Sequence, residues 1–148
     1  MLIRFLRDSR GGIAPLMGIL ALPLMGAVGV AVDFSRFNAT RTAFQSALDS
    51  TSLMLAKSAA TQTAGDLQST ATSTFKALFA HPEASNVAIT ATYSQTNGSK
   101  VTLSGNATID TNFLGVLGYC QLNFSAMSVS TWGNSRLRVA LVLDNTGS

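Results

Sequence analysis

The chain has 148 residues, which is enough for one modest domain. Hydrophobic residues make up 47% of it and charged residues only 11%, well below the roughly 25% of an ordinary globular protein. The net charge of +3 comes entirely from residues 1–41, where five arginines face two aspartates, whereas residues 42–148 carry five charges of each sign. Because a nucleic-acid-binding domain needs a basic face on its folded part, this distribution excludes nucleic acid as a leading partner.

Residues 11–32 form an apolar run of 22 residues without a charge. As a helix it would reach about 33 Å, close to the roughly 30 Å of the hydrocarbon layer. Asp33 follows the run and three arginines precede it: Arg4, Arg7 and Arg10. The positive-inside rule then predicts a transmembrane helix with residues 1–10 in the cytoplasm and the rest exported. Pro23 is expected to kink this helix or to be tolerated through neighbouring helices.

A cleaved secretory signal is the alternative to an anchor. Small residues at Ala27-Val28-Gly29 and at Gly29-Val30-Ala31 would suit a signal peptidase. The apolar run is longer than the roughly 7–15 residues of such signals, and helical patterning continues beyond it. We therefore predict an uncleaved anchor.

Two helical segments are predicted after residue 33. No proline or glycine interrupts residues 34–60, and one broad face of this helix is apolar: Phe34, Phe37, Phe44, Ala47, Leu48, Met54 and Leu55. This face packs either on the domain's own sheet or, in its upper part, against other subunits. A second helix is predicted over residues 66–80, ended by Pro82 and capped by His81.

Apolar and polar residues then alternate, as in half-buried strands. One run covers residues 87–93 and the next covers 101–109, and the Asn97-Gly98 pair between them predicts a β-hairpin. Residues 111–118 are expected to form a short apolar turn or helix. A third strand face follows: Leu122, Phe124, Ala126 and Ser128. The predicted fold class is α+β, with a long N-terminal helix (transmembrane, then amphipathic), a second helix and a small antiparallel sheet.

Few side chains offer catalytic chemistry. The chain has one histidine, His81, and one cysteine, Cys120. Any histidine-based triad would have to use His81, and Cys120 is interpreted as a small apolar residue because nothing around it indicates an activated thiolate. The pair cannot make a zinc site by itself, so an enzyme is the least expected class.

The most chemically specific motif stands near residue 148. The apolar residues 138–143 run into Asp144, Thr146 and Ser148, and a carboxylate with two hydroxyls on alternate residues can converge on a hard cation such as Mg²⁺. The alternative is a turn that ends a strand, since Asp, Asn, Thr, Gly and Ser all favour turns. We favour the turn for this chain, because its residues do not complete a metal site.

Three parts of the sequence carry a family resemblance. The most specific part covers Arg10 to about Ala60: the Arg-Gly-Gly start, the apolar run, Ala31-Val32-Asp33-Phe34, Gln45-Ser46-Ala47-Leu48-Asp49 and the Leu53–Ala60 tail. With the segment from Asn112 to Gly118 and the Ser-rich strand after it, the chain resembles TadG-like proteins of the Tad (Flp) pilus assembly family. The third part, Leu141–Ser148, resembles the opening of the von Willebrand factor A domain that many members carry next.

The resemblance implies a non-enzymatic, inner-membrane-anchored component of pilus assembly whose partners are other pilus assembly subunits. It implies four regions: a cytoplasmic basic segment (1–10), a transmembrane helix (11–32), a periplasmic α+β pilin-like domain (33–135) and the first strand and loop of a truncated A domain (136–148). Asp144, Thr146 and Ser148 would be first-loop ligands of a metal-ion-dependent adhesion site. This set is incomplete, so no cofactor is expected here, and Mg²⁺ only if a complete A domain followed.

Prepilin-like relatives are cut after a glycine and carry Glu as the fifth residue of the mature chain. Here the fifth residue after Gly11 is Leu16, and the fifth after Gly12 is Met17, so we predict that the anchor is retained. Two other function classes stay open. One is an anchored or secreted adhesin that uses the metal-dependent A domain, and the other is an exported domain with a cleaved signal and no pilus role.

Overall fold

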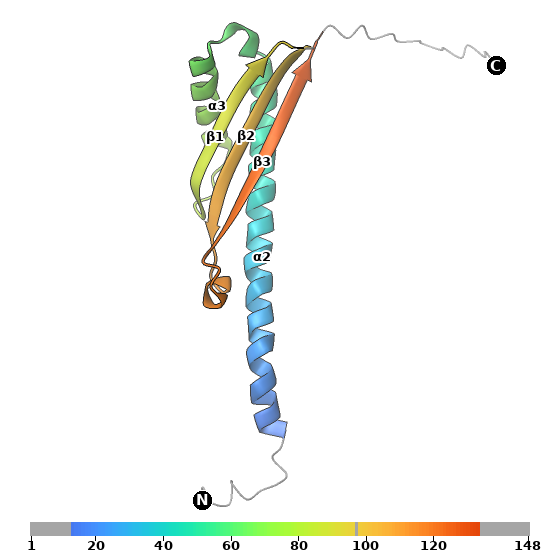
Figure 1. Cartoon of the computed structure of the whole chain (residues 1–148), viewed down its shortest axis with the longest axis vertical. Helices are drawn as coiled ribbons and strands as arrows, with labels where there is room; N and C mark the ends of the chain where they lie inside the picture. Colours follow the sequence, from blue (N-terminus) through green and yellow to red (C-terminus); the bar gives the residue numbers. More distant parts are fainter. Residues whose placement is uncertain (1–12, 97, 134–148) are drawn as a thin grey trace, which may run out of the picture.

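The computed structural model describes residues 13–96 and 98–133, and one long helix dominates it (Figure 1). This helix, α2, runs over Ile13–Ala56 and contains Pro23. It therefore continues through the proline, and the predicted transmembrane and amphipathic helices are one element. It ends four residues before the predicted limit, at a short 3₁₀ turn, η2 (Ala59–Thr61).

The other elements form a small domain around the second half of α2. They are α3 (Ala64–Leu78), β1 (Ala84–Ser94), β2 (Ser99–Asp110), the 3₁₀ turn η3 (Leu114–Leu117) and β3 (Gln121–Trp132). The strands form one antiparallel sheet in the order β1-β2-β3. Both helices lie behind the sheet in Figure 1, with α3 against β1 and α2 against β2 and β3. The predicted α+β class is confirmed.

The predicted hairpin joins β1 to β2. Tyr93 lies opposite Val101 across the ladder, and Gly98 in the turn has φ of +108°, a conformation that glycine adopts without steric cost. The residues that this alternation assigns to one face of β2 are all buried: Val101, Leu103, Gly105, Ala107 and Ile109. The period-two pattern thus predicted both the pairing and the buried face.

The start of β1 departs from the predicted alternation. A β-bulge shifts the register between Ser85 and Ala88, and Asn86 within it has a positive φ of 51°. Because a bulge inserts an extra residue on one strand, it interrupts the regular alternation of side chains. Val87, within the bulge, is 37% exposed and lines a pocket with Phe75 and Lys76 of α3.

The second half of α2 packs on its own sheet, as one of the two alternatives predicted. Four side chains of the predicted face are buried: Phe44, Ala47, Leu48 and Leu55. Phe34 and Met54 are 58% and 57% exposed, so the domain's own sheet does not cover these two members of the apolar face. The sheet covers a narrower stripe of the helix than the apolar face suggested, and this stripe also buries Thr40, Thr51 and Ser52.

Side-chain amides cover parts of both edges of the sheet. On β1, Gln68 of α3 donates to the carbonyl of Ile89 (2.9 Å) and accepts from the N–H of Ala91 (2.8 Å), as a neighbouring strand would. On β3, Gln45 of α2 donates to the carbonyl of Met127 at 3.2 Å. Since open strand edges invite pairing with other chains, these contacts favour a closed three-stranded unit.

Candidate functional site

The first half of α2 presents bare apolar side chains. It extends past the sheet and α3, and no other described element lies beside most of it (Figure 1). Ten large hydrophobic side chains are between 43% and 75% exposed: Ile13, Leu16, Met17, Ile19, Leu20, Leu22, Leu24, Met25, Val28 and Val32. Exposed apolar area on this scale marks a contact with lipid or protein. The helix is long and apolar enough to cross a membrane.

A buried carboxylate marks the end of the apolar half. Asp33 is only 3% exposed, and it accepts hydrogen bonds from three consecutive backbone N–H groups of the β2–β3 connection. Its Oδ1 accepts from Asn112 at 3.1 Å, and its Oδ2 accepts from Phe113 and Leu114, both at 2.8 Å. These N–H groups lie at the start of η3, where they have no partner within the turn itself. Their hydrogen bonds to Asp33 therefore offset the free-energy cost of burying its charge.

A close helix–loop contact lies one turn before Asp33. A methyl group at Gly29 would lie 2.7 Å from Cβ of Phe113, nearer than two carbon atoms can approach. Because Gly29 has no side chain, the Phe113 ring packs directly against the helix backbone at this position. The carboxylate and the ring together fix the β2–β3 connection onto α2 where its apolar half meets its packed half.

This junction was not predicted from the sequence. Asp33 was interpreted as a charge that flanks the membrane segment, and its partners lie 79–81 residues further along the chain. Two signals were available separately, the Ala31-Val32-Asp33-Phe34 motif and the Asn112–Gly118 segment. Local periodicity does not link these two segments, because a hydrogen bond between a side chain and a distant backbone group imposes no repeating pattern on the sequence.

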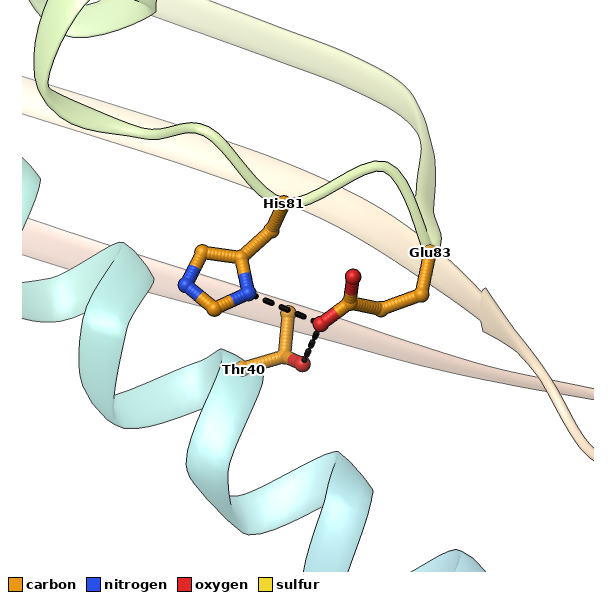
Figure 2. Close-up of polar contacts among 3 residues, drawn as sticks. All are labelled: Thr40, His81 and Glu83. Carbon is orange, nitrogen blue, oxygen red and sulfur yellow. Dashed lines mark hydrogen bonds and ion pairs between the residues drawn. The ribbon is translucent and has the colours of Figure 1, made fainter.

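A second polar cluster ties the α3–β1 connection to α2 (Figure 2). His81 Nδ1 lies 2.8 Å from Glu83 Oε1, and the hydroxyl of Thr40 donates to the same oxygen at 2.9 Å. The His81 ring stacks on Phe79 with centroids 5.0 Å apart. His81 does not cap α3, whose last turn is closed by the N–H of Phe79, so the predicted capping role was wrong.

The cluster favours the ionised form of Glu83. The hydrogen bond from His81 is the main cause that lowers the pKa of Glu83, from an ordinary 4.5 to about 2, and the Thr40 hydroxyl adds to it. A carboxyl whose pKa falls on folding stabilises the fold above its unfolded pKa. That contribution is complete above about pH 5 and is lost as the pH falls from 4.5 toward 2.

We expect Glu83→Gln to destabilise the domain by about 1 kcal/mol at pH 7, since the cluster is partly exposed to water. We also expect it to flatten the acid side of the stability profile between pH 5 and pH 2. Thermal midpoints of the full chain in detergent, measured across this range, test both effects. Asp110→Asn, which removes one negative charge at an exposed site outside the cluster, is the matched control. A wild-type profile no steeper than that of Glu83→Gln would contradict the pKa shift.

The geometry of this cluster does not suit nucleophilic catalysis. A Ser- or Thr-based nucleophile gives its proton to the imidazole, whereas the Thr40 hydroxyl points at the carboxylate. Cys120 is exposed, and it lies outside the cluster, on the β2–β3 connection. Within residues 13–96 and 98–133, no group of three or more His, Cys, Asp or Glu side chains is placed to hold a metal ion.

The predicted metal ligands Asp144, Thr146 and Ser148 lie outside the described residues, as does the apolar strand before them. They stay a prediction, as do the A-domain start at 136–148 and the cytoplasmic segment at 1–10.

The comparison with known families concerns the N-terminal part of the chain. Residues 11–62 match the family model described as Putative Flp pilus-assembly TadE/G-like. The match spans the apolar half of α2, Asp33 and the packed half of the helix, so the predicted Tad resemblance is confirmed for this part. No curated protein and no solved structure matches the chain.

Proposed function

We propose that the protein is an inner-membrane-anchored, non-enzymatic component of Tad (Flp) pilus assembly. The main support is that α2 has two distinct halves. Residues 13–32 are apolar and their large side chains are exposed, while the following turns pack into the core of a folded domain. The Tad match at residues 11–62 covers both halves of α2, which supports an anchor that continues into a folded domain.

The charges on either side of the anchor support one orientation. Three of the first ten residues are arginines, balanced only by Asp8, and the far end of the apolar run carries Asp33. Positive residues are retained on the cytoplasmic side of a membrane. We therefore place the N-terminus in the cytoplasm and the domain, residues 33–135, in the periplasm.

The proposed partners are other pilus assembly subunits, and the open face of the sheet is suited to them. Neither helix covers this face, which is rich in hydroxyl and amide side chains: Thr90, Thr92, Ser104, Asn106, Asn123 and Ser125. It also carries Met127 and Val129, which are 62% and 47% exposed. The depletion of charge and the exposed methionine are two features that this face shares with the cores of protein interfaces.

Membrane fractionation of the full chain with a C-terminal tag tests the anchor. We expect a species of full mass that only detergent extracts, with its N-terminus intact by mass spectrometry. An alkaline phosphatase fusion at the C-terminus is expected to be active, because that enzyme requires export. A soluble species that begins near residue 30 would contradict the anchor, and an inactive fusion with a retained anchor would reverse the orientation.

The pilus role needs its own test. A photo-crosslinker at Ser104, on the open face of the sheet, is expected to capture Tad pilus subunits in a strain that assembles these pili. The matched control carries the crosslinker at Ser73, on the exposed side of α3. Equal capture from both positions, or no pilus subunit from Ser104, would contradict this face as the partner surface.

A further inference from the structure

The β2–β3 connection, residues 111–120, exposes apolar side chains that the described chain leaves uncovered. Phe113 is 50% exposed, Leu117 and Tyr119 are each 65% exposed, and Val116 is 87% exposed. The ten residues contain no charge, and the next charged residue after Asp110 is Arg136. An isolated surface leucine is ordinary, but four large apolar groups on one ten-residue loop form a patch that indicates a binding surface.

This loop is held in a defined shape. Its two ends are joined by the N–H of Thr111, which donates to the carbonyl of Cys120 at 3.0 Å, and by the Thr111 hydroxyl, which donates to the carbonyl of Tyr119. Within it, the N–H of Tyr119 donates to the carbonyl of Leu114 at 3.1 Å. The apolar side chains are therefore displayed by a closed loop.

The loop is placed at one end of the apolar half of α2. Asp33 holds its backbone, and Phe113 lies on Gly29, one helical turn inside the apolar run. Residues 13–32 would span about 30 Å as a helix, the thickness of the hydrocarbon layer, so Gly29 lies about 4.5 Å from the end of that span. Figure 1 shows η3 at the end of the sheet that points toward this half of the helix.

We infer that loop 111–120 is a second membrane contact, inserted into the interface of the bilayer that α2 crosses. The inference rests on the proposed anchor. A lipid surface fits the loop because the patch continues the apolar surface of the anchor, contains no charge and includes Tyr119, whose ring suits the boundary between headgroups and hydrocarbon. Because the domain packs on α2, a second contact restricts the tilt of the whole unit in the bilayer, so the partner face is held at a fixed angle to the membrane.

Cys120, the single cysteine, provides a probe within the loop itself. The full chain is labelled there with an environment-sensitive fluorophore and reconstituted in vesicles of phosphatidylethanolamine and phosphatidylglycerol, with or without nitroxide-labelled lipid. Two further single-cysteine chains serve as references, both in the Cys120→Ser background. Leu22→Cys lies in the anchor, and Gln95→Cys lies in the turn at the opposite end of the sheet.

We expect lipid nitroxide to quench the label at Cys120 nearly as strongly as the label at Leu22→Cys, and several-fold more than the label at Gln95→Cys. Quenching at Leu22→Cys without quenching at Cys120 would overturn the inference and leave the anchor standing. No quenching at either site would overturn both. A Cys120 label that is shielded from water but not quenched by lipid would assign the patch to a second protein and would equally overturn the inference.

A loop variant separates lipid contact from mere proximity. Val116→Ser with Leu117→Ser removes the two most exposed aliphatic groups of the loop and leaves the contacts of Asp33 and Phe113 in place. We expect quenching at Cys120 to fall several-fold and quenching at Leu22→Cys to stay unchanged. Unchanged quenching at Cys120 would contradict insertion of these side chains.

Discussion

Replacing Phe44 by alanine is expected to lower the free energy of unfolding by about 3–5 kcal/mol, the range for a large core aromatic. Phe44 is fully buried at the centre of the domain. Its ring packs edge-on against three others, with centroid distances of 5.0 Å to Phe75, 5.2 Å to Phe79 and 5.2 Å to Phe124. These rings come from three segments, so the truncation leaves a cavity where α2, the α3 region and β3 meet. The loss would be a large fraction of the roughly 5–15 kcal/mol that stabilises an ordinary domain.

Urea unfolding of the full chain in detergent, followed by the fluorescence of Trp132, measures this loss. Trp132 is the single tryptophan, and it stacks on Tyr93 with centroids 5.8 Å apart, so its emission reports on the sheet. Phe34→Ala is the matched control, because it removes the same side chain from the same helix at a position 58% exposed. The control is expected to change stability by less than about 1 kcal/mol. Similar losses in the two variants would show that Phe44 is not the centre of the core.

The predictability of the fold followed the strength of local periodicity. The hairpin was predicted because Asn97-Gly98 separates two alternating runs, and the pairing of Tyr93 with Val101 confirms it. Gly105 occupies an inward position of that alternation although it has no side chain to bury. The structure supplies the reason, since a methyl group at Gly105 would lie 2.8 Å from Cζ of Phe44. The pattern predicted which face was inside, but not the ring that fills it.

The buried polar residues of α2 could not be predicted from the same pattern. A helical wheel assigns each residue to the buried or the exposed face by its hydrophobicity. It therefore assigns the hydroxyl-bearing Thr40, Thr51 and Ser52 to the exposed face. In the structure, the Ser52 hydroxyl lies 2.8 Å from those of both Ser128 and Ser130 on β3. The Thr40 hydroxyl bonds Glu83 on the α3–β1 connection, and the Thr51 hydroxyl is buried without a hydrogen-bond partner among the described residues. The burial of these residues therefore depends on tertiary packing that no single segment reveals.

The candidate site was half predictable for a related reason. The apolar run is a property of composition over residues 11–32, and the part of it that the structure describes belongs to an exposed helix long and apolar enough to cross a membrane. The function of Asp33 depends on which backbone N–H groups are brought to it, and the sequence shows only a charge at the end of an apolar run. Likewise, His81 and Glu83 are neighbours in the chain, but the Thr40 that completes their cluster comes from α2.

Two lysines in the middle of the proposed anchor, Leu22→Lys with Met25→Lys, are expected to abolish stable membrane association. The two side chains are 75% and 72% exposed on the apolar half of α2, so the change leaves the packed domain untouched. Each lysine near the centre of a membrane span costs about 2.5–3.5 kcal/mol, and there a long side chain is least able to reach the headgroups. A pair would cost about 5–7 kcal/mol, enough to reverse a strong preference for the bilayer.

The share of the full chain that stays in carbonate-washed membranes measures this effect. The matched control, Ser46→Lys with Ser50→Lys, adds the same charge on exposed turns of the same helix beyond Asp33, and it is expected to remain in the membrane. Trp132 fluorescence should report a folded domain in both variants, because neither pair lies in the core. Release of the anchor variant alone would show that residues 13–32 retain the protein through lipid contact. Retention of both variants would instead mean that the bare half of α2 is covered by a protein partner, and the apolar surface would then belong to an assembly interface.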